Sequence, residues 1–275
     1  MTLHTKRFIR RAVALPADHG TWVFLLTPLA IGLYVGGRWT TASAYLVVAA
    51  LTGFLLRQPL TIAIKALSGR RSRDDLRPAL SWALLYTTVG LAHVIGLALR
   101  GYGYVLYLAI PGVAVFVWHL YLISRRQERD QLAIELLGSG VLALAATGAY
   151  WVGVGRPDPA GWLLWGLAWI QSAASILYVL LRLNQRSAAE DLTWRELVAM
   201  ARPALALATL NLGFVSALCA ANVVPRWLFV PYLVQWLEVL RGTLQPAFAL
   251  QPRAIGFRQL AVSTLFTLLF ILTWN

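Results

Sequence analysis

The chain has 275 residues, of which 59% are hydrophobic and only 13% are charged. Soluble domains carry about 25% charged residues, so the composition excludes an ordinary soluble domain and predicts a membrane protein. The net charge of +13 would favour a nucleic-acid partner if it stood alone. The single cysteine, Cys219, excludes a disulfide framework and a zinc-binding cysteine pattern.

The positions of the positive charges argue against nucleic acid. Of the 24 Lys and Arg residues, 19 lie at every second junction between long apolar segments. The other junctions hold one each, namely Arg38, Arg100, Arg156 and Arg226. Since cytoplasmic loops of membrane proteins are enriched in Lys and Arg, we expect a cytoplasmic N-terminus and an outer C-terminus. The pattern predicts a multi-pass protein of the bacterial cytoplasmic (inner) membrane.

The apolar segments have the length of spanning helices, which need about 20 residues each. About nine can be drawn in chain order: 21–36, 42–66, 79–99, 102–123, 132–153, 162–183, 203–221, 227–240 and 257–273. They do not alternate polar and apolar residues as the strands of a membrane barrel do. We therefore predict an all-α polytopic transmembrane helical bundle, a single integral membrane domain over residues 1–275 with a short cytoplasmic segment at 1–20.

The connections on the cytoplasmic side are longer than those outside. In one of them, Thr193 and Glu196 form a capping-box pattern, which predicts the start of a short amphipathic helix on the membrane surface. The unequal loops suggest that the cytoplasmic side is the working side. The alternative is that these loops only orient the protein.

Ionisable residues inside spans are costly and are therefore functional candidates. The directions of the spans place a group of them in one layer just inside the cytoplasmic interface. We expect this layer to bind a ligand in a polar cavity that opens to the cytoplasm. The candidate ligand-binding residues are Arg57, Asp18, His19, His119, Glu135, Glu238 and Arg182.

The alternative for this layer is a set of interfacial side chains and structural ion pairs, such as Glu238 with Arg241. Arg57 lies deeper than the others, which favours a function or a buried pair. His93 and His119 are expected at different depths, which disfavours a haem held by two histidines. The remaining polar residues inside spans are expected to join helices by hydrogen bonds; they are Gln171, Ser172, Ser175 and Asn211. No metal site and no catalytic constellation is identified.

Two short motifs carry a family resemblance. Residues 15–22 read Leu-Pro-Ala-Asp-His-Gly-Thr-Trp, and Pro28 and Gly32 follow in the first span. The second span contains Arg57-Gln58-Pro59. Both resemble the YwiC-like membrane proteins, although Asp18 stands where that family usually has Glu. The resemblance implies the context of a membrane fold rather than an activity.

The plan of the chain also resembles the UbiA-type intramembrane prenyltransferases, which have about nine spans and enlarged cytoplasmic loops after the second and sixth. In that family, two Asp-rich motifs bind magnesium and the prenyl diphosphate. Here Asp74 and Asp75 are adjacent, as are Glu190 and Asp191, so the motif spacing is absent. This departure argues against magnesium-dependent prenyl transfer, whereas arginine can bind an anionic or quinone head group without a metal.

The expected function is therefore binding of a lipid or isoprenoid quinone head group, without catalysis and with no cofactor other than that bound lipid or quinone. The partners expected are membrane lipids and the other protein subunits of a larger membrane complex, in which the chain is a subunit or an assembly partner. One alternative is a divergent intramembrane prenyl or lipid transferase that uses Asp18, His19 and Glu135. A second alternative is a transporter with Arg57 as a counter-charge for its substrate.

Overall fold

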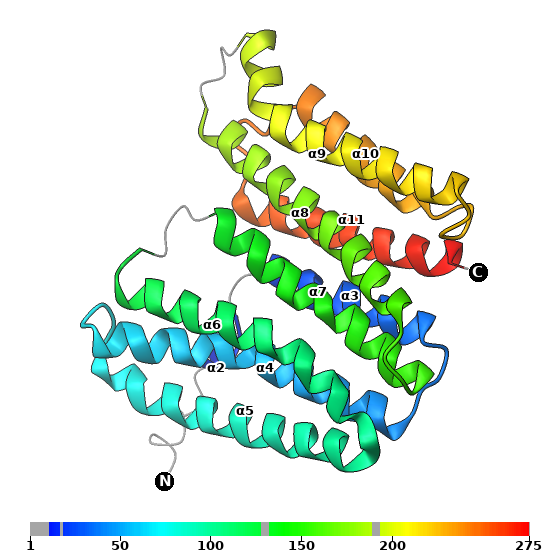
Figure 1. Cartoon of the computed structure of the whole chain (residues 1–275). Helices are drawn as coiled ribbons and strands as arrows, with labels where there is room; N and C mark the ends of the chain where they lie inside the picture. Colours follow the sequence, from blue (N-terminus) through cyan, green and yellow to red (C-terminus); the bar gives the residue numbers. More distant parts are fainter. Residues whose placement is uncertain (1–10, 17–18, 128–131, 189–192, 275) are drawn as a thin grey trace.

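The computed structural model describes residues 11–16, 19–127, 132–188 and 193–274, and the fold is all-α (Figure 1). A short helix α2 (Arg11–Ala14) and a 3-10 turn η1 (His19–Trp22) precede the long helices. Those are α3 (Val23–Val35), α4 (Thr41–Leu67), α5 (Leu76–Leu97), α6 (Ala109–Ser124), α7 (Leu132–Val154), α8 (Pro159–Ser187), α9 (Trp194–Ala220), α10 (Phe229–Leu244) and α11 (Pro252–Thr273). Each of these nine helices overlaps one predicted apolar segment.

The expected number of spans is corrected, however. Within the described part of the chain, six segments are long and apolar enough to cross a membrane, and Arg73–Ser124 is one of them although it contains both α5 and α6. Helix α3 has 13 residues and α10 has 16, fewer than the roughly 20 that a bilayer core requires. The structure therefore supports nine helices but six candidate spans.

The connection between α5 and α6 shows why one predicted segment begins too early. After α5 the chain forms a π turn over Ala98–Tyr102 and a 3-10 turn over Gly103–Leu108. Gly101 has a φ of 87°, which glycine adopts without a steric penalty. The apolar residues from 102 onward thus form a tight reversal first, and α6 begins only at Ala109.

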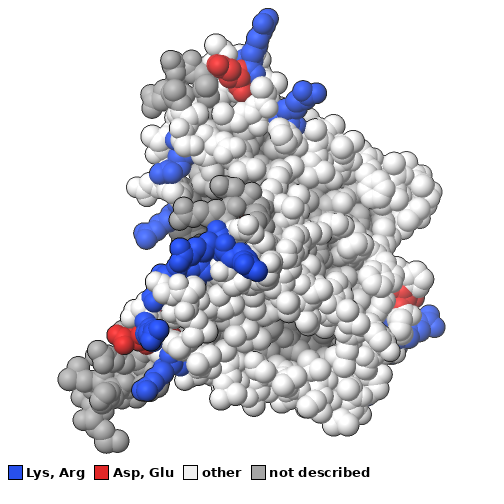
Figure 2. Space-filling view, turned by 60° about the vertical axis from the view of Figure 1, so that its left-hand side comes forward, with Lys and Arg blue, Asp and Glu red and all other residues white. Residues whose placement is uncertain are grey.

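The helices run roughly along one direction and pack in successive layers (Figure 1). From one edge to the other the order is α5, then α4 with α6, α3 with α7, α8 with α11, and α9 with α10. The connections that follow α4, α6, α8 and α10 lie at the same end of the bundle. We call this the basic end, because Figure 2 shows Lys and Arg gathered along it and few at the opposite end.

The centre of the bundle is a close crossing of α3 and α7. A Cβ atom added at Gly32 would lie 2.2 Å from the carbonyl oxygen of Ala146, and one added at Gly153 would lie 2.7 Å from the Cα of Gly36. Gly32 and Gly36 are four residues apart, the spacing at which small residues let two membrane helices approach backbone to backbone. This contact sets the position of α3, eight of whose residues are buried.

At the neighbouring interface of α7 and α8, two tryptophan side chains of α8 pack against the backbone of α7 around Gly140. Trp165 Nε1 donates to the carbonyl oxygen of Gly140 at 2.8 Å, and Trp169 Nε1 donates to that of Leu136 at 3.0 Å. A Cβ at Gly140 would lie 2.8 Å from the Trp169 ring. The absence of a side chain at Gly140 thus lets α7 and α8 pack closely.

The capping box at Thr193 is present, but it begins a different helix from the one expected. The side chains of Thr193 and Glu196 each accept a hydrogen bond from the backbone amide of the other. The helix that follows is α9, which has 27 residues and continues to Ala220. Pro203 lies inside α9 rather than at its start. The prediction of a separate surface helix is therefore wrong, because a strong N-terminal cap precedes the proline by ten residues.

Candidate functional site

The predicted site residues lie in two groups. Arg182 and Glu238 belong to a polar network between α8, α10 and α11, whereas Arg57 and Glu135 lie on α4 and α7. His119 lies on α6 and is half-buried. Asp18 lies outside the described residues; the backbone of His19 begins η1, and its side chain is likewise outside them.

In the first group, Glu238 joins three helices through one carboxylate. Tyr178 Oη on α8 donates to Glu238 Oε1 at 2.6 Å, and Arg258 Nη2 on α11 donates to Oε2 at 2.7 Å. Arg258 Nε also donates to Oε1. The expected partner, Arg241, donates instead to Gln245 Oε1 at 3.1 Å. The Glu238 side chain is 11% exposed, whereas that of Arg258 is 38% exposed, so the carboxylate of this ion pair is nearly enclosed and the guanidinium is partly solvated.

Arg182 binds the carboxyl end of α10. Its Nη1 donates to the carbonyl oxygens of Gly242 at 2.8 Å and Gln245 at 2.6 Å, and to Gln185 Oε1 at 2.9 Å. Gln185 Nε2 adds a bond of 3.0 Å to the same Gly242 oxygen. The last carbonyls of a helix lack internal donors and carry partial negative charge, so the buried guanidinium satisfies that end.

The same seam continues along α8 with neutral groups. Gln235 Nε2 of α10 donates to the carbonyl oxygen of Gln171 at 2.9 Å and to Ser175 Oγ at 3.1 Å. Asn211 Nδ2 of α9 donates to the carbonyl oxygen of Ile170 at 2.7 Å. The expected role in joining helices is confirmed for Ser175 and Asn211. The side chains of Gln171 and Ser172 instead donate within α8, to Ser175 Oγ and to the carbonyl oxygen of Ala168.

The free space at this network is too small for a head group. A cavity lined by residues that include Ser175, Tyr178, Gln235, Glu238 and Gln259 has a volume of about 10 Å³, which is room for about one water molecule. Glu238 and Arg182 thus belong to a packed polar interface.

The second group centres on Arg57, which is exposed on α4. Glu135 of α7, also exposed, lies close enough to interact with it electrostatically. Helix α6 contacts both α4 and α7. Arg57 and Glu135 are therefore charged neighbours on adjoining helices.

Two distant segments of sequence meet next to Arg57. The rings of Trp22 and Phe54 lie edge to face with their centroids 5.1 Å apart. Gln58 Nε2 donates to the carbonyl oxygen of Ala12 at 3.2 Å. Helix α2 and the end of η1 are thereby held against α4, at positions that flank Arg57 in the sequence.

A comparison with known families matches residues 15–150 to the YwiC-like proteins. Over these residues, the chain belongs to the YwiC-like family. The resemblance based on residues 15–22 and 57–59 is confirmed. In the structure, Trp22 of the first motif packs against Phe54 of α4, and Gln58 of the second motif, itself on α4, donates to the carbonyl oxygen of Ala12. No curated protein and no solved structure matches the chain.

The YwiC-like segment contains Arg57, Glu135 and His119, whereas the Glu238 network lies entirely outside it. Sequence reasoning missed Gln58, whose position beside Arg57 in the motif was the available signal. It also missed Arg258, which was counted among the charges that orient the protein, and Gln185, Gln235 and Gln259, which carry no charge.

Proposed function

We propose that this YwiC-like protein binds the head group of a lipid or isoprenoid quinone at Arg57 and does not itself catalyse a reaction. The observation that carries the proposal is the exposed side chain of Arg57 within the candidate span α4, between Phe54, which packs against Trp22, and Gln58, which binds Ala12. A cation at that position in a spanning helix is costly unless it serves a ligand, a pathway or a partner group.

The chemistry of Arg57 suits such a ligand. A guanidinium presents five donors in a planar fork, which matches phosphate and carbonyl oxygens. Glu135 next to it offers an acceptor for a hydroxyl or an amine of the same head group. The contacts of Trp22 and Gln58 restrain the surroundings of Arg57, and this reduces the entropy lost when a ligand binds.

The topology proposed with this function has the basic end in the cytoplasm of a bacterium, with the protein in its inner membrane. The excess of Lys and Arg at that end supports this orientation. A subunit role in a larger membrane complex is supported by the exposed apolar side chains of α5 and α6, such as Leu84 at 69% and Ile110 at 63%, which lipid or a neighbouring membrane protein must cover.

The test is retention of bound lipid by purified protein. We expect Arg57→Ala to lower the amount of co-purifying anionic lipid or quinone on the order of tenfold, because one charge-assisted hydrogen bond contributes about 1.5–3 kcal/mol. Lipid extraction and mass spectrometry measure it. Arg38→Ala, which removes an exposed cation at the opposite end of the bundle, is the matched control, and Arg57→Lys should retain part of the binding.

Unchanged retention in a folded Arg57→Ala protein would mean that Arg57 is structural. Incubation with a prenyl diphosphate and Mg²⁺ examines the non-catalytic part of the proposal. Release of diphosphate that disappears in Glu135→Gln would establish a transferase instead.

A further inference from the structure

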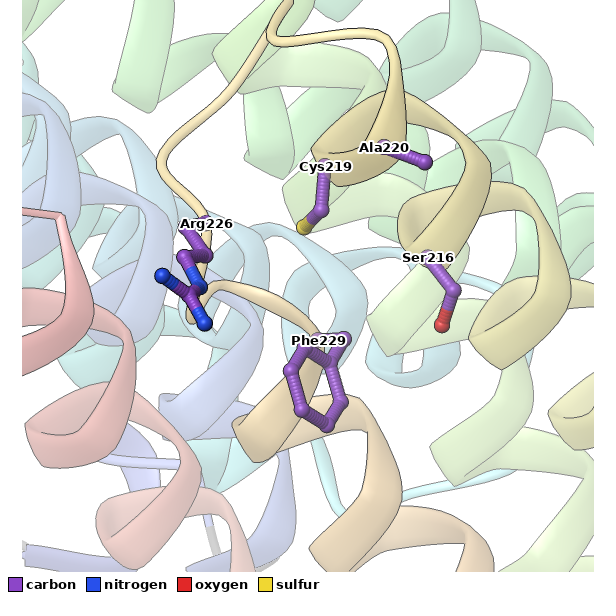
Figure 3. Close-up of a pocket in the computed structure, with 5 residues that line it drawn as sticks. All are labelled: Ser216, Cys219, Ala220, Arg226 and Phe229. Atoms are coloured by element: carbon purple, nitrogen blue, oxygen red, sulfur yellow. The ribbon is translucent and has the colours of Figure 1, made fainter.

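At the end of the bundle opposite the basic end, α9 and α10 separate and leave a hollow of about 320 Å³. Figure 3 shows its lining side chains. They come from the last turns of α9, from the connection before α10 and from the first residue of α10. They are Ser216, Cys219, Ala220, Arg226 and Phe229. None of them belongs to the Arg57 or Glu238 groups.

The connection between the two helices holds this hollow open. At the end of α9, Asn222 adopts a φ of 56°, and the amide of Val223 donates to the carbonyl oxygen of Leu218 at 3.0 Å, an arrangement that ends a helix sharply. Leu228 is fully buried and anchors the start of α10. The Cys219 thiol also contacts the carbonyl oxygen of Pro225, with the sulfur 3.3 Å from the oxygen.

The lining combines one cation with apolar walls. Arg226 is exposed, and its guanidinium carbon lies 5.1 Å from the ring centroid of Trp227, which is itself 54% exposed. Stacking on an aromatic ring restrains the orientation of the guanidinium. Phe229 lines the hollow below Arg226 in the view of Figure 3, Ala220 lines it at the end of α9, and Ser216 contributes a hydroxyl one helical turn earlier on α9.

We propose that this hollow is a binding site for an anionic phospholipid of the leaflet at this end of the bundle. The phosphate binds Arg226, and an acyl chain packs against Phe229 and runs past Ser216 toward the middle of the bundle. Arginine forms paired hydrogen bonds with phosphate oxygens, and exposed tryptophans such as Trp227 are typical of the membrane interface. The volume is within the range of ligand clefts, about 300–1,000 Å³.

The apolar walls suit a lipid, whose acyl chain can lie against them, rather than a free phosphate ion. Burial of an acyl chain contributes about 0.8 kcal/mol for each CH₂ group removed from water, but in a bilayer that chain is already in an apolar medium. The expected preference for an anionic over a neutral lipid therefore comes from the net charge of its head group at Arg226. Because Arg226 precedes α10 and Arg57 lies within α4, and these two helices occupy separate layers of the bundle, this site does not depend on the proposed function.

Cys219 provides the measurement, because it is the only cysteine in the chain and its side chain lines the hollow. The protein is reconstituted in nanodiscs of phosphatidylcholine with or without phosphatidylglycerol, and alkylation of Cys219 by a small thiol reagent is followed by mass spectrometry. We expect phosphatidylglycerol to slow alkylation, and Arg226→Gln to reduce this protection on the order of tenfold.

Two variants and one ion complete the test. Arg38→Gln removes another exposed cation at the same end and should leave the protection unchanged, whereas Ser216→Leu, which fills the hollow, should abolish it. Equal protection in wild-type and Arg226→Gln protein, or protection by inorganic phosphate as strong as that by phosphatidylglycerol, would overturn the proposal.

Discussion

The carboxylate of Glu238 accepts hydrogen bonds from side chains on two other helices, one of them a tyrosine and the other an arginine. If one partner of the Glu238–Arg258 ion pair is removed, the other is left without its counter-charge. The free energy lost in this way exceeds what the pair itself contributes to stability. The two single substitutions should therefore not add.

We expect Glu238→Ala to lower the free energy of unfolding by about 2–4 kcal/mol and to lower the Tm measured in detergent. Arg258→Ala should also destabilise, although less, because Arg258 is 38% exposed and is partly solvated already. The double variant should be more stable than the sum of the two losses predicts, by about 1–2 kcal/mol. Additive losses would show that the two side chains act independently.

Some of the charged residues of this network could be predicted from the sequence, whereas the neutral ones and the pairing could not. Arg182 and Glu238 could be selected because an ionisable residue in an apolar segment is conspicuous. Gln185 binds the same Gly242 oxygen as Arg182, yet a neutral amide in a helix has no sequence signature of its role. The partner of Glu238 depends on the packing of α10 against α11, so local sequence favoured Arg241 on the same helix over Arg258.

At the scale of elements, the crossing of α3 and α7 depends on the absence of side chains at particular positions. Helices elsewhere in the bundle contain glycines with open space around them. Among the described atoms, none lies within 4 Å of a Cβ added at Gly166 on α8. Gly32 and Gly166 form a matched pair of positions, because an added methyl group meets backbone at Gly32 and open space at Gly166.

Gly32→Ala should separate α3 from α7 and lower the free energy of unfolding by about 3 kcal/mol, because the new methyl group would meet the backbone of Ala146. Gly166→Ala should be neutral or stabilising by up to about 1 kcal/mol, since alanine favours a helix. Thermal unfolding in detergent compares the two variants. An equal response would show that the α3–α7 contact adapts to an added methyl group.

Nine helices were predictable because apolar length is the dominant signal in a membrane sequence. Their ends were less predictable, since they depend on single residues. Thr193 begins α9 well before its apolar stretch, and Gly101 delays α6 by several residues. Whether a helix is long enough to span alone is a further matter. Helix α3 is shorter than its predicted segment 21–36, and α10, although longer than its predicted segment 227–240, still has only 16 residues.

For the whole molecule, the asymmetry of charge predicts its orientation. Trp39 lies two residues before α4 and Leu67 ends it, so the two mark opposite ends of one helix. Their side chains are 74% and 70% exposed. Neither carries a charge, so their replacement leaves the orienting pattern unchanged.

In a Cys219→Ala background, we expect Trp39→Cys to react with a membrane-impermeant thiol reagent in intact cells. Leu67→Cys should react only after the cells are permeabilised, because the excess of positive charge predicts that its end of the bundle faces the cytoplasm. Labelling of both residues is followed on a gel. The reverse order of labelling would place the basic end outside.

The short length of α3 has a consequence for the biosynthesis of the protein. At 1.5 Å per residue, its 13 residues extend about 20 Å, whereas the hydrocarbon core of a bilayer is about 30 Å thick. Its close partner α7 is translated about 100 residues later, which at 5–20 residues per second takes on the order of 5–20 s. Throughout that interval α3 lacks the helix that covers Gly32 and Gly36. Helix α3 must therefore remain at the insertion machinery or the membrane surface until the ribosome has synthesised α7.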